Sequence, residues 1–215
     1  MPILRLGFEL AARCFPAQEV GGDFYDWQLL EAGCLNFTLG DVMGKGMPAA
    51  LLMTTVRATL RALGAQYTPA TRIDAAQALL ASDLGGSESF VTLFHAQLNC
   101  RDRQLSYIDA GHGLVLLKRA NGEIKPLLKG GIPMGILPEQ NYQSGNILFE
   151  QNDALLVFSD GLPEVFPDAI KRPEVFTSLL QGTTSATDIL NRMFRLVPAN
   201  TALLDDLTVL VLYCR

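Results

Sequence analysis

The sequence has few of the residues that bind zinc or nucleic acid. It contains two histidines and four cysteines among 215 residues, and no cysteines are spaced as C-x-x-C. A zinc centre of the Cys/His type is therefore not expected. The net charge is -5, whereas domains that bind nucleic acid usually carry a basic stripe. Any metal ion bound by this chain should accordingly have oxygen ligands, and no nucleic-acid partner is predicted.

Long apolar stretches are also missing. No run of about 18 apolar residues occurs, so no transmembrane helix is expected and we predict no membrane association. The first five residues, MPILR, lack the basic region and apolar core of a signal peptide. The scattered cysteines indicate a reducing compartment rather than a disulfide scaffold. These features together predict a cytoplasmic protein.

The length and composition are those of one globular domain. The chain is 49% hydrophobic and 18% charged, which is typical of a protein with a buried core. No internal repeat, low-complexity tract or linker interrupts it. Because 215 residues suffice for one well-buried domain, we predict a single domain over residues 1–215.

The hydrophobic pattern predicts an α+β fold. Alternating or continuous apolar runs predict strands over residues 4–15, 28–30, 35–39, 90–98, 104–109, 115–118, 123–127, 146–149, 154–158 and 207–214. Apolar residues at helical spacing predict helices over residues 48–63, 68–86, 173–180 and 187–196. The helices come in pairs, after the third strand and before the last one. Sheets packed face to face with helices outside would bury these apolar faces.

Several acidic residues share one property, since each lies at the edge of a predicted strand beside glycine or another acid. They are Asp23, Asp41, Asp160 and the pair Asp205-Asp206. Any one of them fits an ordinary surface turn. If they meet at one rim of a sandwich, their charges repel unless hard cations such as Mg²⁺ or Mn²⁺ bind there. Two such ions about 3.5–4 Å apart could share Asp41 and activate a bridging water.

The order of these motifs resembles the metal-dependent protein phosphatase superfamily, the PP2C-like group, and in particular its bacterial SpoIIE/RsbU-like branch. The match runs over nearly the whole chain. It consists of Pro16-Ala17 with residues 20–26 (VGGDFYD), 40–51 (GDVMGKGMPAAL), 90–92 (FVT), 110–112 (AGH), 133–135 (PMG), 159–161 (SDG) with Glu164, and 205–208 (DDLT). The segment 165–170 departs from the family pattern, which concerns a local loop rather than the metal motifs.

The resemblance implies a four-layer α-β-β-α sandwich of two antiparallel sheets flanked by helices. It also implies hydrolysis of phosphoserine or phosphothreonine by in-line attack of water, without a phospho-enzyme. By the family pattern Asp41 would bridge two divalent cations, Mn²⁺ or Mg²⁺, and the Val42 carbonyl would bind one of them. Asp160 and Asp205 would complete the shell of the second cation, and Asp23 would act through a metal-bound water. Asp41, Asp160 and Asp205 are thus the expected catalytic residues.

The resemblance also suggests partners. It implies a phosphorylated anti-sigma-factor antagonist as substrate, and a sensor or receiver domain upstream, which would make this chain the catalytic output part of a longer regulatory protein. A different class of function is a phosphatase-like output module that binds a regulator without turnover. The intact Asp41, Asp160 and Asp205 favour the enzyme. A two-metal nuclease is a weaker third option, because the chain is acidic.

For four further residues near the motifs, the sequence either leaves the role undecided or favours a structural one. Lys45 fits a phosphate contact and a solvated side chain equally well. For His112 we favour a structural role over general acid catalysis, since nothing pairs with it in sequence. Asp206 matches the second acid of the family pattern, but the resemblance implies no clear role for it. Arg13 is the nearest upstream arginine, and we favour a place on the strand surface over a phosphate contact.

Overall fold

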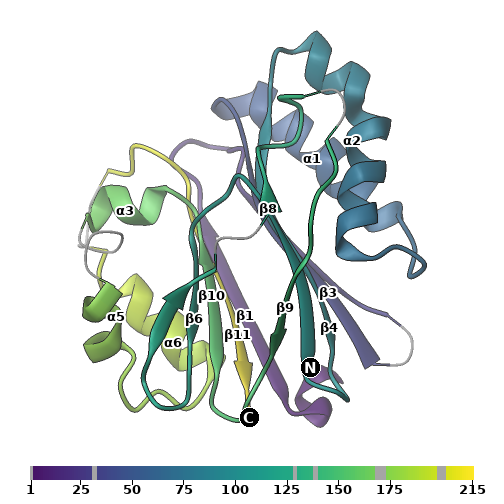
Figure 1. Cartoon of the computed structure of the whole chain (residues 1–215). Helices are drawn as coiled ribbons and strands as arrows, with labels where there is room; N and C mark the ends of the chain where they lie inside the picture. The colour runs from purple at the N-terminus through teal and green to yellow at the C-terminus, as the bar shows by residue number, and fades with distance from the viewer. Residues whose placement is uncertain (1, 31–32, 128–129, 138–139, 168–172, 198–201) are drawn as a thin grey trace.

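The fold is an α-β-β-α sandwich. The computed structural model describes residues 2–30, 33–127, 130–137, 140–167, 173–197 and 202–215. Two sheets lie face to face in the middle, and helices cover the outer face of each (Figure 1). The predicted fold class and layering are confirmed.

The first sheet joins the two ends of the chain. Its strands run in the order β1-β11-β10-β6-β7, with antiparallel neighbours throughout. Their bounds are β1 Phe8–Phe15, β6 Val115–Lys118, β7 Ile124–Pro126, β10 Ala154–Phe158 and β11 Leu207–Cys214. Every residue of β10 and β11 is buried, because these central strands are covered on both faces.

The second sheet carries one of the predicted metal ligands, Asp41. Its strands are β2 Phe24–Leu29, β3 Cys34–Val42, β4 Val91–Asn99, β5 Gln104–Ala110 and β8 Gly130–Gly131, in that order, with β9 Gly145–Leu148 paired to β5. The pairs are antiparallel except for the short β5–β8 contact. Asp41 pairs with Thr92 at the end of β3, so the register places this carboxylate at the rim of the sheet.

The helices divide between the two outer faces. Helices α1 Gly46–Ala62 and α2 Pro69–Gly86 pack on the second sheet, and α3 Gly161–Val165, α5 Pro173–Leu179 and α6 Ala186–Phe194 pack on the first. Three apolar layers result, one between the sheets and one beneath each group of helices. Among the described residues, no helix combines the length and the apolar character needed to cross a bilayer.

The observed elements differ from the predicted ones in four places. The strand predicted over residues 4–15 begins only at Phe8, because Pro2–Leu6 form a 3-10 helix and Gly7 adopts a positive φ of 83°. The short helix α3 follows Ser159, where only a turn was predicted. Gly130–Gly131 pair with β5 as β8, where no strand was predicted. The strand predicted over residues 28–30 covers only the end of β2, which begins at Phe24. The remaining strand and helix predictions agree with the structure within a few residues at each end.

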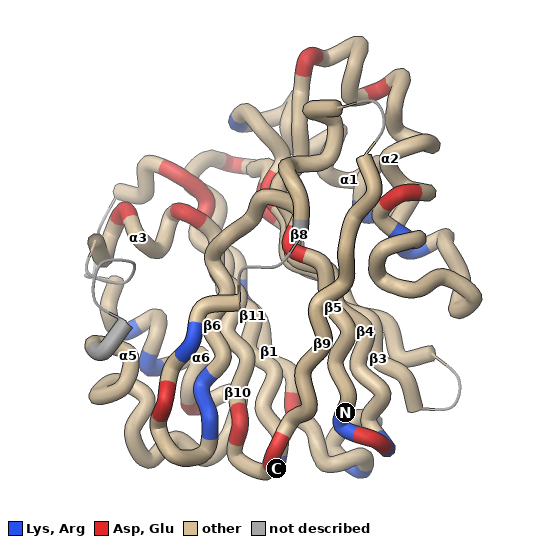
Figure 2. The backbone as a smooth tube through the Cα atoms, in the orientation of Figure 1, with Lys and Arg blue, Asp and Glu red and all other residues tan. Residues whose placement is uncertain are grey.

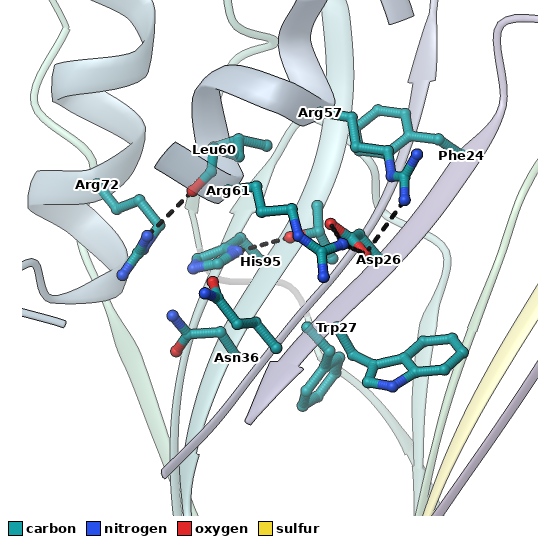
Figure 3. Close-up of a pocket in the computed structure, with 12 residues that line it drawn as sticks. Phe24, Asp26, Trp27, Asn36, Arg57, Leu60, Arg61, Arg72 and His95 are labelled. Atoms are coloured by element: carbon teal, nitrogen blue, oxygen red, sulfur yellow. Dashed lines mark hydrogen bonds and ion pairs between the residues drawn. The ribbon is translucent and has the colours of Figure 1, made fainter. Parts of the chain in front are cut away.

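Polar groups fasten the α1–α2 pair to the second sheet (Figure 3). The guanidinium of Arg61 donates to both carboxylate oxygens of Asp26 on β2, at 2.7 and 2.9 Å. Arg72 of α2 is buried and donates to the carbonyls of Leu60 and Leu63, and to that of Gly64, at the end of α1. The last carbonyls of a helix have no partner within the helix. Arg72 therefore satisfies the end of α1 from the neighbouring helix.

Candidate metal centre and active site

Three of the predicted acidic residues reach one cavity. Asp41 comes from the end of β3, Asp160 from the junction of β10 and α3, and Asp205 from the segment before β11. All three line a cavity of about 370 Å³, together with residues that include Lys45 and His112. Figure 2 shows acidic positions gathered at this end of the sandwich, where the chain enters α1 and α3. Carboxylates separated by more than a hundred positions of sequence thus meet in space.

Ser159 brings Asp160 and Asp205 side by side. Its backbone N–H donates to the Thr208 carbonyl, and its hydroxyl accepts from the Thr208 N–H, both at 2.9 Å. The same hydroxyl donates to the carbonyl of Asp206 at 2.9 Å. These bonds tie the end of β10 to the start of β11. Asp160 precedes α3 but makes no capping hydrogen bond with its side chain, which leaves its carboxylate to face the cavity.

Asp206 organises the loop that carries Asp23. Its two carboxylate oxygens accept hydrogen bonds from the backbone N–H groups of Ala17, at 2.8 Å, and of Asp23, at 3.3 Å. Asp206 does not line the cavity shared by the other acids. Sequence reasoning left its role open, and the structure assigns it the positioning of the 17–23 segment. The sequence could not predict this role, because the two backbone donors lie more than 180 positions away from Asp206.

Asp23 and Val42 lie close to Asp41 but do not line the cavity that Asp41 shares with Asp160 and Asp205. Asp23 is 7% exposed, and its Oδ2 has no hydrogen-bond partner among the described residues. An added Cβ at Gly22 would lie 2.5 Å from the Val42 carbonyl oxygen and 3.3 Å from a carboxylate oxygen of Asp41. Only glycine permits so close an approach. The loop therefore brings Asp23 alongside Asp41 and the Val42 carbonyl, and the metal-binding roles of these groups stay predictions.

Burial and mutual repulsion raise the pKa values of three of the acids, Asp23, Asp41 and Asp160. The pKa of Asp23 is raised to about 8, chiefly by burial, and the charge of Asp41 adds to the shift. The pKa of Asp41 is raised to about 7 by burial and then by the charges of Asp160, Asp205 and Asp206. The pKa of Asp160 is raised by burial and by Asp205. Such a cluster favours the binding of cations, which would stabilise the ionised carboxylates.

The donor set suits hard divalent cations that keep part of their water shell. The groups that converge are carboxylate oxygens, with the Val42 carbonyl nearby. Mg²⁺ prefers such ligands and is commonly held by one or two carboxylates plus several waters. Within the described ranges, no group of three His, Cys, Asp or Glu side chains lies close enough together to hold a metal ion by itself, so waters and the Val42 carbonyl would have to complete any metal shell here. A cavity of about 370 Å³ has room for ions together with their waters, so the residues present fit the predicted cations.

His112 links two segments at the cavity wall. Its backbone N–H donates to Asp109 at 2.7 Å, and its Nε2 lies 3.0 Å from the Phe158 carbonyl. Burial lowers the pKa of His112 to about 4, so the neutral ring donates its Nε2 hydrogen to that carbonyl. These bonds agree with the structural role favoured from the sequence.

Arg13 points away from the cavity. Its guanidinium reaches Asn191 and lies over the ring of Phe194 on α6. The place on the strand surface that the sequence favoured is therefore confirmed, and Arg13 is not a phosphate ligand of this cavity.

The family follows from comparison with known sequences. Residues 31–215 match the sequence model described as Stage II sporulation protein E (SpoIIE). The chain belongs to the SpoIIE family. Among curated relatives, it is 27% identical over 216 residues to the phosphoserine phosphatase RsbU of Bacillus subtilis (strain 168). That alignment covers 95% of this chain and 62% of RsbU, so this member of the SpoIIE family spans less than two thirds of that relative.

Solved structures show the same fold. The RsbU and RsbW domains of Rv1364c from Mycobacterium tuberculosis superpose with a TM-score of 0.84 at 24% identity, over 97% of this chain and 62% of that one. The PP2C phosphatase domain of SpoIIE from Bacillus subtilis gives 0.76 at 19%, over 96% and 63%. The catalytic domain of the serine/threonine phosphatase PstP, in complex with 2 manganese ions, gives 0.71 at 20%, over 96% and 97%. The predicted SpoIIE branch is confirmed by the family model, and these structures confirm that the fold is that of PP2C-like phosphatases.

Proposed function

We propose that this chain is the catalytic domain of a metal-dependent serine/threonine protein phosphatase. The observation that carries the proposal is the meeting of Asp41, Asp160 and Asp205 around one cavity from three separate segments. RsbU, a relative within the same family, is named a phosphoserine phosphatase. An acidic cavity of this kind repels a phosphate dianion unless cations are present, so the proposed activity requires bound metal.

The predicted cofactors are two divalent cations, Mn²⁺ or Mg²⁺. Asp41 would bridge them, the Val42 carbonyl would join one, and Asp160 and Asp205 would hold the other. Such ions lower the pKa of a bound water and neutralise the oxygens of a phosphoryl group. The solved PstP domain carries 2 manganese ions, and RsbX was solved with magnesium, which supports this class of cofactor.

The chain's own residues would orient the reactants. The buried carboxylate of Asp23, with an oxygen free of partners in the described residues, would hold a water beside Asp41. Asp206 would keep Asp23 in place through the two backbone hydrogen bonds of the loop. Asp41, Asp160 and Asp205 would fix the direction from which water meets the phosphoryl group. Positioning of this kind supplies much of the rate enhancement in phosphoryl transfer.

The substrate we propose is a phosphorylated anti-sigma-factor antagonist. Two observations support it: the relative RsbU is a phosphoserine phosphatase, and a solved neighbour joins RsbU and RsbW domains. We also propose that residues 1–215 form one catalytic domain that works with a sensor or receiver domain upstream. The relatives that align with this chain extend beyond the aligned part.

Turnover of an aryl phosphate tests the proposal. The wild-type domain with Mn²⁺ should hydrolyse it, and Asp41→Ala or Asp160→Ala should abolish the activity. Asp102→Ala serves as the control, since Asp102 lies in an exposed turn far from the cavity. Release of phosphate from phosphorylated antagonist proteins would then identify the substrate. A folded wild-type domain without Mn²⁺-dependent turnover of either substrate would instead support an output module that binds a regulator.

A further inference from the structure

Lys45 is the one cationic side chain at the rim of the acidic cavity. Among the described residues that line it, no other lysine or arginine occurs. The Lys45 ammonium lies 2.8 Å from Oδ2 of Asp205 and also donates to the carbonyl of Leu204. Its side chain is 48% exposed, so solvent and a bound substrate can both reach it. Lys45 is therefore a solvent-accessible charge beside the carboxylates rather than part of the buried core.

The position of Lys45 in the chain keeps its ammonium near the metal motif. It follows Asp41 by four positions and immediately precedes α1. It makes no capping hydrogen bond to that helix with its side chain. Lys45 also borders a second hollow of about 590 Å³, lined by Pro48, Leu51 and other residues of α1 and α2. Lys45 thus lines both the cavity of the carboxylates and this second hollow.

We propose that Lys45 is a phosphate-binding residue, which exchanges its ion pair with Asp205 for the phosphoryl oxygens of the substrate. This inference rests on the proposed phosphatase function and adds a residue to it. When Asp205 serves a divalent cation, its charge is shared, and the ammonium gains by turning to another anion. A phosphoryl dianion in the cavity is that anion, and a lysine binds it as a point charge.

The chemistry of the site also calls for such a residue. No arginine lines the cavity within the described ranges, and Arg13 is engaged on the outer face by Asn191 and Phe194. His112 is neutral and already donates to the Phe158 carbonyl. Lys45 is therefore the side chain that can offer positive charge to a phosphoryl group at the mouth.

The test measures phosphate binding directly, apart from turnover. Inorganic phosphate is titrated calorimetrically into Mn²⁺-loaded wild type, Lys45→Met, Lys45→Arg and Lys125→Met. Lys125 is the matched control, since its side chain is 55% exposed on β7 and its one ion pair within the described residues is with Glu123 at the surface. The methionine variant should bind phosphate about tenfold more weakly or worse, because a charge-assisted hydrogen bond is lost. The arginine variant should stay within about threefold of wild type, as it keeps the charge, and Lys125→Met should match wild type.

A second titration separates phosphate binding from a structural role. Mn²⁺ binding by Lys45→Met, measured without phosphate, should equal that of wild type or be tighter, because the variant lacks the ammonium that competes with Mn²⁺ for Asp205. The inference is overturned if Lys45→Met binds phosphate like wild type, if it loses Mn²⁺ affinity along with phosphate, or if wild type binds no phosphate. A wild type that binds phosphate through Lys45 but hydrolyses no phosphoprotein keeps the inference and contradicts the proposed function.

Discussion

The backbone N–H of Asp23 donates a hydrogen bond to Oδ2 of Asp206, across 183 positions of sequence. The other carboxylate oxygen of Asp206 accepts from Ala17 in the same loop. One buried side chain thus fixes the segment that places a second acid beside Asp41. The proposed metal site depends on such polar contacts between segments, and each of them can be tested separately.

Replacing Asp206 with asparagine should destabilise the protein. Asparagine has a single acceptor oxygen, so the N–H of Ala17 or Asp23 would be left without its partner. We expect a loss of about 1–3 kcal/mol in the free energy of unfolding, measured by urea denaturation. The control is Asp188→Asn, which removes a surface pair with Arg192 on α6 and should cost less than about 1 kcal/mol. Equal losses of unfolding free energy in the two variants would contradict the proposed role of Asp206 in positioning the 17–23 segment.

Although Gly21→Ala adds only one methyl group, it should reduce both the stability of the protein and its affinity for Mn²⁺. The added Cβ would lie 1.6 Å from Oδ2 of Asp206, so the loop or the carboxylate must move. We expect weaker Mn²⁺ binding and a lower melting temperature. Gly86→Ala is the matched control, because nothing lies within 4 Å of the corresponding position at the end of α2. That variant should melt at or slightly above the wild-type temperature, since alanine favours helix.

The buried Arg72 should matter more to stability than the exposed arginines of α1. Arg72→Met would leave the buried carbonyls of Leu60 and Leu63, at the end of α1, without this donor. Unpaired buried acceptors make a loss of about 2–4 kcal/mol the expected result in urea denaturation. Arg57→Met removes a 3.6 Å contact with Asp26 at the surface and should cost less than about 1 kcal/mol. A small effect of Arg72→Met would show that another group satisfies the helix end.

Stability should depend on pH through His95. Its pKa is lowered to about 3, chiefly by burial and then by the positive charge of Arg72, while Nδ1 bonds to the Thr38 hydroxyl at 2.7 Å. The unfolded chain binds this proton near pH 6.5. Between about pH 6.5 and 3 the unfolded state thus binds more protons, and stability falls as pH falls, by up to about 1.4 kcal/mol per pH unit.

His95→Gln isolates this contribution. The free energy of unfolding of the variant should fall less steeply than that of wild type between pH 6 and 5, by about 1 kcal/mol. His112, with a pKa lowered to about 4, acts in the same direction as His95. Asp23 and Asp41 act in the opposite direction, because their pKa values are raised in the fold. All three remain in both proteins, so they cancel in the comparison, and parallel pH profiles would contradict the assignment.

The sequence predicted the layers of this fold better than its polar contacts. Apolar periodicity located β10, β11 and the α1–α2 pair, because burial against a sheet leaves a regular pattern. The same pattern wrongly predicted strand at residues 4–7. There the apolar run continues through a 3-10 helix that ends at Leu6, just before Gly7 with its positive φ. The five residues of α3 were missed, since so short a helix has no period to detect.

The candidate site was predicted as a set of acids and not as an arrangement. Motif order pointed to Asp41, Asp160 and Asp205, which the structure brings to one cavity. The carboxylate of Asp206 turns to backbone N–H groups, and Lys45 pairs with Asp205. Both contacts depend on how distant loops meet, and no local pattern in the sequence encodes them.

Binding of Mn²⁺ by wild type and by Asp41→Asn tests the account most directly. Calorimetric titration is suitable because it needs no substrate and no turnover. Asp41 is proposed to bridge both ions, so the wild-type domain should bind two Mn²⁺. Asp41→Asn should bind at least about tenfold more weakly, because the neutral amide lacks the negative charge that the carboxylate offers to both cations. Asp102→Asn should match wild type. If Asp41→Asn takes up Mn²⁺ with wild-type affinity and stoichiometry, the proposed metal centre is wrong.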